Sequence, residues 1–370
     1  MKDRSNSKVT LILPVRRAGR QVERCLRSIC AGTVVPEILV MDCTAEPGAL
    51  ERVKREFPGV RYFDFGMNPG RAHAVNTGIH LARTPYVMTF SPELTAGKHC
   101  VEMLCRALDE DRDLMSVQAG ILSAEDPARI LGAGWSLPLG VVLGADPVVR
   151  GNGARAPYGK RAGITAAQME AAVYRMEHLE VTGILDERYY GRLEDLDLGL
   201  RGILCGFRHL YEPRAVCREI GRAIEDAGTE GASKSRFYRQ LEIGNMIYFR
   251  YKFGLDSRLR SQARAVLGRD EAAVTRGRML CFQAEMESME RDELGMSVTK
   301  QTLPEECCLG MKQNGPDNVY PLFVGERVWG PFEDSTGTIR VGAALLSGTG
   351  EKIRSRMRSV RERGSGAGIF

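Results

Sequence analysis

Carboxylates are concentrated at three places in the first 220 residues, each where a predicted strand ends or a predicted helix begins. They are Asp42, Glu93 and the cluster Glu194-Asp195-x-Asp197. Separate carboxylates can contact a nucleoside, hold a divalent cation on a diphosphate, and take a proton from an attacking hydroxyl. The three sites therefore offer the groups that chemistry at a nucleotide diphosphate would need, with one carboxylate as a candidate base.

Alternating strands and helices are predicted for the first 125 residues. Apolar runs of strand length occur at 9–15, 38–41, 60–65, 86–90 and 114–121. Helical periodicity lies between them at 22–29, 71–82 and 101–108. This alternation is typical of an α/β fold with a mostly parallel sheet flanked by helices. Ligands bind such sheets beyond the carboxyl ends of the strands, where Asp42 and Glu93 are predicted to lie.

The chain from 130 to 165 is rich in Gly and Pro, which predicts long loops with short strands. Helices are predicted near 175–183, 193–205 and 233–253, and a short strand at 207–211. The acidic cluster occupies the first turn of the 193–205 helix, where carboxylates suit the positive end of the helix dipole.

Several classes of protein are excluded by composition and spacing. Hydrophobic residues make up 43% of the 370 residues, as in a globular protein, and the net charge is +5. No apolar run approaches the ~18 residues of a membrane span. The ten cysteines contain no C-x-x-C pair, and the five histidines have no zinc-ligand spacing. We therefore expect reduced cysteines and a cytoplasmic location, with no signal peptide before the first strand.

Common nucleotide-binding loops and a hydrolase motif are also absent. Gly153 and Gly159 are separated by five residues, and Arg161 stands where a phosphate-binding loop needs Ser or Thr. Gly151-x-Gly153 begins no predicted helix, and no G-x-S-x-G sequence occurs. A bound nucleotide is therefore held by other means.

Five segments in the correct order resemble family 2 glycosyltransferases of the GT-A fold, particularly the rhamnosyltransferase-like bacterial members. They are V-T-L-I-L-P-V with C-L-R-S-I (9–29), E-I-L-V-M-D (37–42), N-P-G-R-A-H-A-V-N-T-G-I (68–79), T-P-Y-V-M-T-F-S-P-E-L (84–94) and G-I-L-D-E-R-Y-Y-G-R-L-E-D-L-D-L-G-L-R-G (183–202). The resemblance extends from about residue 9 to about residue 253 and implies a GT-A fold over this part of the chain.

The resemblance implies an inverting transfer of a sugar from a nucleotide-diphosphate donor, such as dTDP-rhamnose or another UDP- or GDP-sugar. The implied acceptor is a glycan or lipid-linked glycan in bacterial surface polysaccharide synthesis. The family's catalytic base maps onto Asp195, with Glu194 and Asp197 on the acceptor side. The donor-binding positions map onto Pro14, Val15, Arg16, Asp42, Asn68, Gly70, Arg71, Asn76 and Ser91.

The predicted metal site departs from the family pattern. Ser91-Pro92-Glu93 stands where the family usually has Asp or Asn, then any residue, then Asp. Glu219 stands where the family often has His. The resemblance thus implies Mg²⁺ or Mn²⁺ held by Glu93 and Glu219, because both cations favour oxygen ligands. In the alternative, arginines neutralise the diphosphate without metal, and the candidates are Arg16, Arg17, Arg71 and Arg218.

Two other functions stay open at this point. One is a catalytically silent GT-A module that binds a nucleotide sugar or a partner enzyme, which Ser91 favours because it replaces a carboxylate. The other is a nucleotidyltransferase on a similar sheet, which lacks support because no Gly-rich, Lys-containing loop occurs near the amino terminus. Without the resemblance, the residues favour Asp195 as an acid that stabilises a helix start, and Asp42 can equally be a turn residue that ends a strand.

The predicted domains are a GT-A domain at 1–255 and a C-terminal extension at 256–350, helical and then a small β unit. The GT-A domain divides into a nucleotide-sugar-binding half at 1–125 and an acceptor half at 126–255. A basic tail follows at 351–370, with six Lys or Arg and two acidic residues, so that 6 − 2 = +4 of the net charge lies there. Its amphipathic part, 351–363, predicts either peripheral contact with an anionic membrane or a solvated terminus, and no element for nucleic-acid binding accompanies it.

Overall fold

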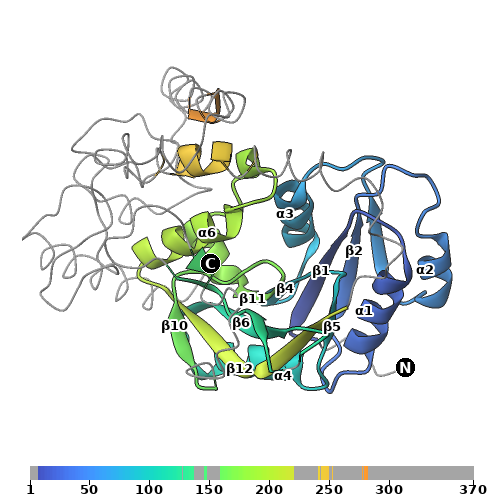
Figure 1. Cartoon of the computed structure of the whole chain (residues 1–370), viewed down its shortest axis with the longest axis horizontal. Helices are drawn as coiled ribbons and strands as arrows, with labels where there is room; N and C mark the ends of the chain where they lie inside the picture. The colour runs from blue at the N-terminus through green and yellow to red at the C-terminus, as the bar shows by residue number, and fades with distance from the viewer. Residues whose placement is uncertain are drawn as a thin grey trace, which may run out of the picture.

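The computed structural model describes residues 7–126, 128–136, 146–147, 159–220, 241, 243–249, 252, 277 and 279–281. Within this part of the chain, a ten-stranded sheet is flanked by helices on both faces (Figure 1). The predicted basic tail at 351–370 lies outside the described residues, as does most of the predicted C-terminal extension at 256–350 with its small β unit. No helix in the described part is both long and apolar enough to cross a membrane.

The amino-terminal half is a parallel α/β unit, as predicted. Its strands are β1 (Val9–Val15), β2 (Glu37–Asp42), β3 (Arg61–Asp64) and β4 (Tyr86–Phe90). They lie in the order β4-β1-β2-β3, and every pair is parallel. The helices between them are α1 (Arg20–Cys30), α2 (Glu51–Glu56) and α3 (Arg71–Leu81). The carboxyl ends of the four strands therefore meet at one edge.

The second half of the sheet is mixed. Its long strands are β6 (Leu114–Leu122), β11 (Ala171–Arg175) and β12 (Arg208–Glu219). β11 lies antiparallel between β4 and β6, while β12 is parallel to β6. Three short strands add to the edges, β5 (Leu94–Ala96) and β10 (Ala162–Ile164) on β12 and β7 (Ile130–Gly132) on β6. β8 (Trp135–Ser136) and β9 (Asp146–Pro147) form a separate pair.

The predicted α/β fold with a helix-flanked sheet is confirmed, and its second half adds antiparallel strands. β11, inserted antiparallel between β4 and β6, was not predicted, because it is a five-residue, alanine-containing strand that gives little periodic signal. One prediction in this half was wrong in its bounds. The strand predicted at 207–211 is a 12-residue strand that continues to Glu219. Its register shifts between Glu212 and Val216, around Pro213, and this irregularity breaks the alternation expected of a strand.

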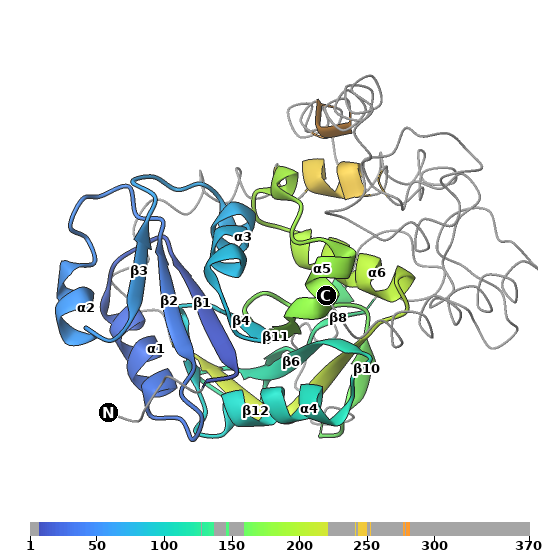
Figure 2. The same ribbon diagram turned by 180° about the vertical axis from the view of Figure 1, so that it is seen from behind.

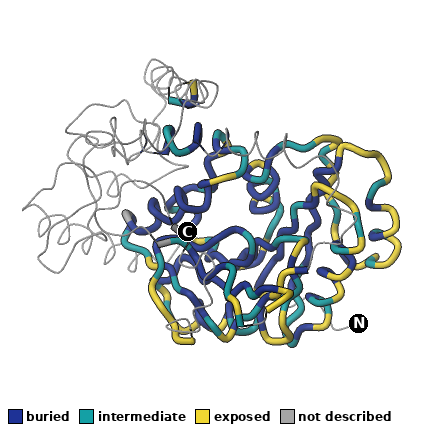
Figure 3. The backbone as a smooth tube through the Cα atoms, viewed as in Figure 1, coloured by how far each residue is buried: buried dark blue, intermediate teal, exposed yellow. Residues whose placement is uncertain are grey.

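Alternate side chains of the strands pack into two cores, one on each face of the sheet. Leu11 and Leu13 of β1 belong to one core, and Ile12 between them belongs to the other. Helices α1, α2 and α4 (Cys100–Glu110) cover the first core, and α3, α5 (Met176–Thr182) and α6 (Glu194–Leu204) cover the second (Figure 2). The buried strands of Figure 3 thus run between two helical layers.

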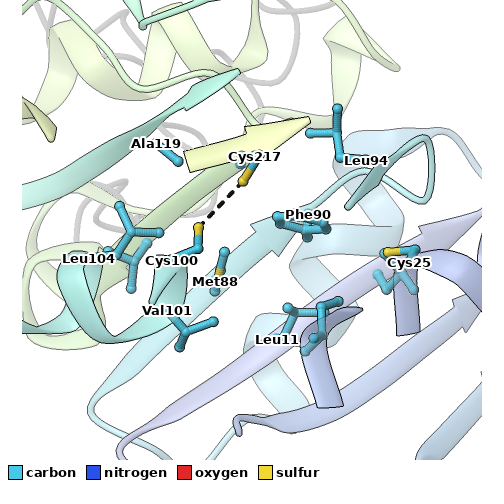
Figure 4. Close-up of a cluster of buried hydrophobic side chains, with 14 of the residues drawn as sticks. Leu11, Cys25, Met88, Phe90, Leu94, Cys100, Val101, Leu104, Ala119 and Cys217 are labelled. Atoms are coloured by element: carbon cyan, nitrogen blue, oxygen red, sulfur yellow. Dashed lines mark hydrogen bonds between the residues drawn. The ribbon is translucent and has the colours of Figure 1, made fainter. Parts of the chain in front are cut away.

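The described cysteines are free, as expected, and most are buried. Cys100 and Cys217 lie in the first core with their sulfur atoms 3.4 Å apart, between α4 and β12 (Figure 4). The Cys100 contact and burial hold the pKa of the Cys217 thiol well above its usual value, so this thiol stays protonated. These cysteines act as small apolar side chains.

Candidate functional site

The acidic cluster lies in the first turn of α6, as predicted, and its three carboxylates are buried. The chain enters the helix through two non-glycine residues in the left-handed region, Tyr190 with φ 61° and Leu193 with φ 71°. Such backbone conformations cost energy and occur preferentially at functional sites. The entry to α6 is therefore a locally strained segment that fixes where the carboxylates lie.

Asp195 has the electrostatic surroundings of a base. Its carboxylate accepts hydrogen bonds from the backbone N–H of Leu196 at 2.9 Å and of Met169 at 3.3 Å. The side chain is 2% exposed, and burial raises the pKa of its carboxyl to about 7. The neighbouring Glu194 carboxylate adds to this rise, and the Arg71 guanidinium opposes it. A base with a pKa near the working pH is well matched to proton abstraction.

An indole N–H without a partner lies beside this carboxylate. The Nε1 atom of Trp135, on β8, is buried and has no hydrogen-bond partner among the described residues. The indole is near enough to Asp195 to lower the pKa of the carboxyl, although no hydrogen bond of normal geometry joins them. Buried N–H groups are nearly always satisfied, and this donor lies where it can bond the Asp195 carboxylate or a ligand held there.

Arg71 connects α3 to the acidic cluster. Its Nε donates to Glu194 at 2.6 Å, and its Nη1 donates to Glu170 at 2.7 Å. The second Glu194 oxygen accepts the backbone N–H of Arg192. Because both oxygens of the buried Glu194 carboxylate are occupied, this residue is suited to orienting its neighbours. Its predicted contact with the acceptor stays a prediction.

Gly70 allows this close approach of α3 to the 190–193 segment. Its φ is 93°, and a Cβ atom at this position would lie 2.6 Å from the Tyr190 ring. The Tyr190 carbonyl accepts the backbone N–H of Arg71 at 2.7 Å, at the start of α3. A side chain at residue 70 would push these two segments apart. The close approach of α3 to residues 190–193 therefore requires glycine in the Asn68-x-Gly70-Arg71 sequence.

Ser91 joins the site through β11. Its backbone N–H donates to the carbonyl of Glu170 at 2.8 Å, because β11 begins where β4 ends. Glu170 in turn contacts Arg71, which contacts Glu194. A continuous chain of contacts therefore leads from the carboxyl end of β4 to the acidic cluster, through a residue that the sequence did not indicate.

The predicted nucleoside end lies where β1 and β2 finish. Val15 and Asp42 are opposite each other in the parallel register, with Pro14 opposite Met41. Asp42 is buried, and its Oδ1 accepts the backbone N–H of Thr44 at 3.0 Å and the Thr44 hydroxyl at 2.6 Å. The exposed Arg16 follows β1 directly at the same sheet edge.

Asn68 and Asn76 bond within the chain. The Asn68 side chain accepts the backbone N–H of Gly70 at 3.1 Å. The buried Asn76 amide donates to the Leu185 carbonyl at 2.8 Å and to Glu187 at 2.9 Å, and accepts the Leu185 N–H at 3.0 Å. Asn76 thus fixes the segment before the acidic cluster, while direct donor contact by either Asn stays a prediction.

The two predicted metal ligands are brought together by the pairing of β5 with β12. Glu219 lies opposite Leu94, and the N–H of Ile220 donates to the Glu93 carbonyl at 2.7 Å. Both carboxylates are exposed, and neither makes a hydrogen bond or ion pair with another described residue. Among these residues, no three His, Cys, Asp or Glu side chains gather into a metal cluster. One or two carboxylates are enough for Mg²⁺ when substrate phosphates complete its shell, and a cation held by Glu93 and Glu219 stays a prediction.

Two residues near Asp195 were missed by the sequence analysis. Glu170 follows Gln168-Met169 and has no recognisable motif, because its position depends on the antiparallel placement of β11. Trp135 lies in the Gly-rich region, and only its pairing with Ala166 brings it to the site. Trp135 is one of just two tryptophans in the chain, and that rarity was the one available signal.

The amino-terminal part of the chain is similar to a known family. Residues 10–133, about a third of the chain, match the family model described as glycosyl transferase family 2. The match includes Asp42, Arg71 and Glu93 and ends before the α6 cluster. No curated protein matches the chain.

The structure resembles solved glycosyltransferases. GalNAc-T7 with UDP, GalNAc and Mn²⁺ is similar with a TM-score of 0.54 and 14% identity, over 79% of this chain. The mannosyltransferase PcManGT from Pyrobaculum calidifontis, in complex with GDP-Man and Mn²⁺, has a TM-score of 0.46 and 16% identity over 79% of this chain and 77% of that chain. The chain spans 58% of GalNAc-T7. The mixed sheet with helices on both faces is thus the GT-A fold that the sequence predicted.

Proposed function

We propose that the chain is an inverting glycosyltransferase that moves a sugar from a nucleotide diphosphate to an acceptor hydroxyl, with Asp195 as the base. One observation carries this proposal. In a GT-A fold, Asp195 stands at the start of α6 in surroundings that raise the pKa of its carboxyl to about 7. A structural acid at a helix start gains nothing from such a rise, whereas proton transfer to a base is most efficient when its pKa lies near the working pH.

The proposed reaction is a single displacement. The acceptor oxygen attacks the anomeric carbon and forms the new C–O bond, while the bond from that carbon to the diphosphate oxygen breaks. The hydroxyl proton passes to the Asp195 carboxylate, and the bonding electrons leave with the nucleotide diphosphate. The Trp135 indole N–H, which has no partner among the described residues, donates to the sugar or acceptor oxygen held at Asp195.

Donor binding is proposed at the carboxyl ends of β1, β2 and β4, where ligands of parallel sheets bind. Asp42 contacts the nucleoside, and Arg16 the diphosphate. Glu93 and Glu219 would hold Mg²⁺ or Mn²⁺, which neutralises charge on the leaving diphosphate when bound. Arg71 is less suited to that task, because its guanidinium is already paired with two carboxylates.

The acceptor class rests on the sequence resemblance. We propose a glycan or lipid-linked glycan of bacterial surface polysaccharide synthesis, made by a rhamnosyltransferase-like enzyme on the cytoplasmic side of the membrane. The basic segment 351–363 would then contact anionic lipid, and it lies outside the described residues. A silent nucleotide-sugar-binding module is the second candidate, favoured by Ser91 in place of a metal-binding carboxylate.

Binding of nucleotide diphosphates tests the donor site. We expect one of UDP, GDP or dTDP to raise the Tm of the full chain, and Mn²⁺ to increase the rise. A ligand at 100-fold excess over its Kd stabilises the folded state by about 2.7 kcal/mol. Differential scanning fluorimetry with and without Mn²⁺ measures the shift.

Three Glu-to-Gln variants separate the roles at this site. Glu93→Gln and Glu219→Gln should remove the Mn²⁺-dependent part of the shift, because they remove the proposed ligands. Glu125→Gln, at another exposed carboxylate, should leave it unchanged. If the Tm shift of the unmodified chain is independent of Mn²⁺, arginine side chains rather than a metal ion neutralise the diphosphate. A chain that binds a diphosphate but transfers no sugar from any nucleotide sugar would be the silent module.

A further inference from the structure

A fully buried lysine lies beneath the entry to α6. Lys252 is 0% exposed, and its Nζ contacts Asp186 at 2.9 Å and Asp197 at 2.6 Å. Asp186 precedes η1 (Glu187–Tyr189), and Asp197 is in the first turn of α6. The Lys252 ammonium group thus connects Asp186, before the strained residues 190–193, to Asp197, after them. Removing it would leave two buried carboxylates short of a partner, so the lysine is a required part of this packing.

Two tyrosines complete the network around Lys252. The Tyr248 hydroxyl donates to Asp186 at 2.9 Å, and the Tyr189 hydroxyl donates to Asp197 at 3.1 Å. The two rings pack with their centroids 5.2 Å apart. Arg201 adds a bond to the other Asp197 oxygen at 2.8 Å. Both Asp197 oxygens are therefore engaged, which gives this residue an orienting role.

Asn245 holds the strained segment directly. Its Nδ2 donates to the carbonyl of Tyr189 at 2.8 Å and to the carbonyl of Arg192 at 2.9 Å. These carbonyls lie on either side of the left-handed Tyr190, and Leu193 follows immediately. Because one amide binds both, the distance between the two carbonyls is fixed. Asn245 is fully buried, so water cannot replace it.

The residues that carry these contacts come from one later part of the chain. We call it the Asn245 segment, meaning the described helical residues 241, 243–249 and 252. It lies outside the matched residues 10–133 and beside the entry to α6, where Figure 1 draws it in gold. It contacts residues 186–197 through three side chains, Asn245, Tyr248 and Lys252.

We propose that Asn245 and Lys252 are positioning residues of the active site, which hold residues 186–193 in the conformation that presents Asp195. The link to sugar transfer rests on the proposed function, whereas the clamping of the segment rests on these contacts alone. Neither residue touches the reacting atoms. Their effect reaches Asp195 because residues 186–193 are continuous with the first turn of α6.

Hydrogen exchange on the full chain tests the clamp without any substrate. Asn245→Leu keeps the branched shape of the side chain but removes its hydrogen bonds to the Tyr189 and Arg192 carbonyls, so we expect amides of 187–196 to exchange at least about tenfold faster. Thr84→Val is the matched control. It removes two buried hydrogen bonds, to the Tyr86 carbonyl at 2.7 Å and to Thr10 at 2.8 Å, at the amino end of β4. The control should leave the exchange of 187–196 unchanged.

Kinetics on the same variants test the link to catalysis. Asn245→Leu should lower kcat about tenfold or more while the Kd for the stabilising nucleotide diphosphate stays the same. Lys252→Met should act in the same direction, and Lys252→Arg should restore part of the loss by keeping the charge. If Lys252→Met fails to fold, the kcat of Asn245→Leu still tests the link between the clamp and catalysis.

Each outcome separates the two proposals. Unchanged exchange of 187–196 in Asn245→Leu overturns the clamp, whatever the rates. Faster exchange with an equal loss of kcat in Thr84→Val overturns the positioning role, because general destabilisation then explains the loss. Faster exchange in a chain that transfers no sugar supports the clamp and contradicts the proposed function.

Discussion

Asp195→Asn is expected to lower the rate of sugar transfer by about 10²–10⁴-fold, the usual contribution of a general base. The amide has the shape of the carboxylate and can still accept the Leu196 N–H, but it cannot take the acceptor proton. Nucleotide binding should be unchanged, because Asp195 contacts no part of the proposed donor site at β1 and β2. Single-turnover transfer and calorimetric titration with the nucleotide diphosphate measure the two effects.

The same substitution is expected to stabilise the fold. The folded-state pKa of Asp195 lies above its value in the unfolded chain, so the folded state binds more protons. This contribution to stability is fully present below the unfolded pKa, near 4, and is lost as the pH rises to about 7. Removing the charge should therefore raise the Tm at pH 8 and have little effect at pH 4.

Asp197→Asn is the matched control on the same turn. Asp197 binds Lys252, Arg201 and Tyr189, so its amide variant should lower the Tm. If Asp195 were only a structural acid, Asp195→Asn would also lower the Tm, because it would lose about 0.3–1 kcal/mol of interaction with the helix dipole. A lower Tm for Asp195→Asn at pH 8 would thus contradict the burial and charge that we assign to the base.

Arg71→Met is expected to reduce the free energy of unfolding by about 3–5 kcal/mol. This is the usual cost of leaving a buried charge without its partner. Glu194 is fully buried and its contact with Arg71 is 2.6 Å, so the lost charge leaves it uncompensated. Urea unfolding of the full chain measures the change. The double variant Arg71→Met with Glu194→Gln should recover much of the loss, because no unpaired carboxylate remains.

Arg71→Met should also change the pH dependence of transfer. The Arg71 charge lowers the pKa of Asp195, so its removal should shift the midpoint of the pH profile above about 7. Arg161→Met is the matched control. It removes a 2.6 Å contact to the buried Glu212, which keeps Arg214 as a partner. Equal shifts of the pH midpoint in Arg71→Met and Arg161→Met would contradict a direct electrostatic effect of Arg71 on Asp195.

The amino-terminal half of the fold could be predicted because each strand carries its own signal. Leu11 and Leu13 face one core and Ile12 the other, and the continuous apolar run typical of a strand buried on both faces is visible in the sequence alone. The α6 carboxylates could also be predicted from the sequence, because they lie on one turn of one helix. Local sequence patterns were sufficient to predict the elements and residues whose positions do not depend on the pairing of distant segments.

The second half and the surroundings of the base depend on such pairing. β11 is inserted between β4 and β6, and only this topology brings Glu170 to Ser91. Trp135 reaches Asp195 through a two-residue strand, too short to give a pattern. Asn245 and Lys252 act across more than 50 residues of sequence on the segment before α6. No spacing rule predicts these contacts, because they form only after the sheet is assembled.

The pH dependence of kcat/KM for sugar transfer is the most direct test of Asp195 as the base. The nucleotide sugar would be the one whose diphosphate stabilises the chain. We expect kcat/KM to rise about tenfold per pH unit below a midpoint near 7 and to level off above it, because only the ionised carboxylate accepts the proton. The residual activity of Asp195→Asn should show no such rise. A profile that is flat from about pH 5 to 9 in the unmodified enzyme would contradict the assignment.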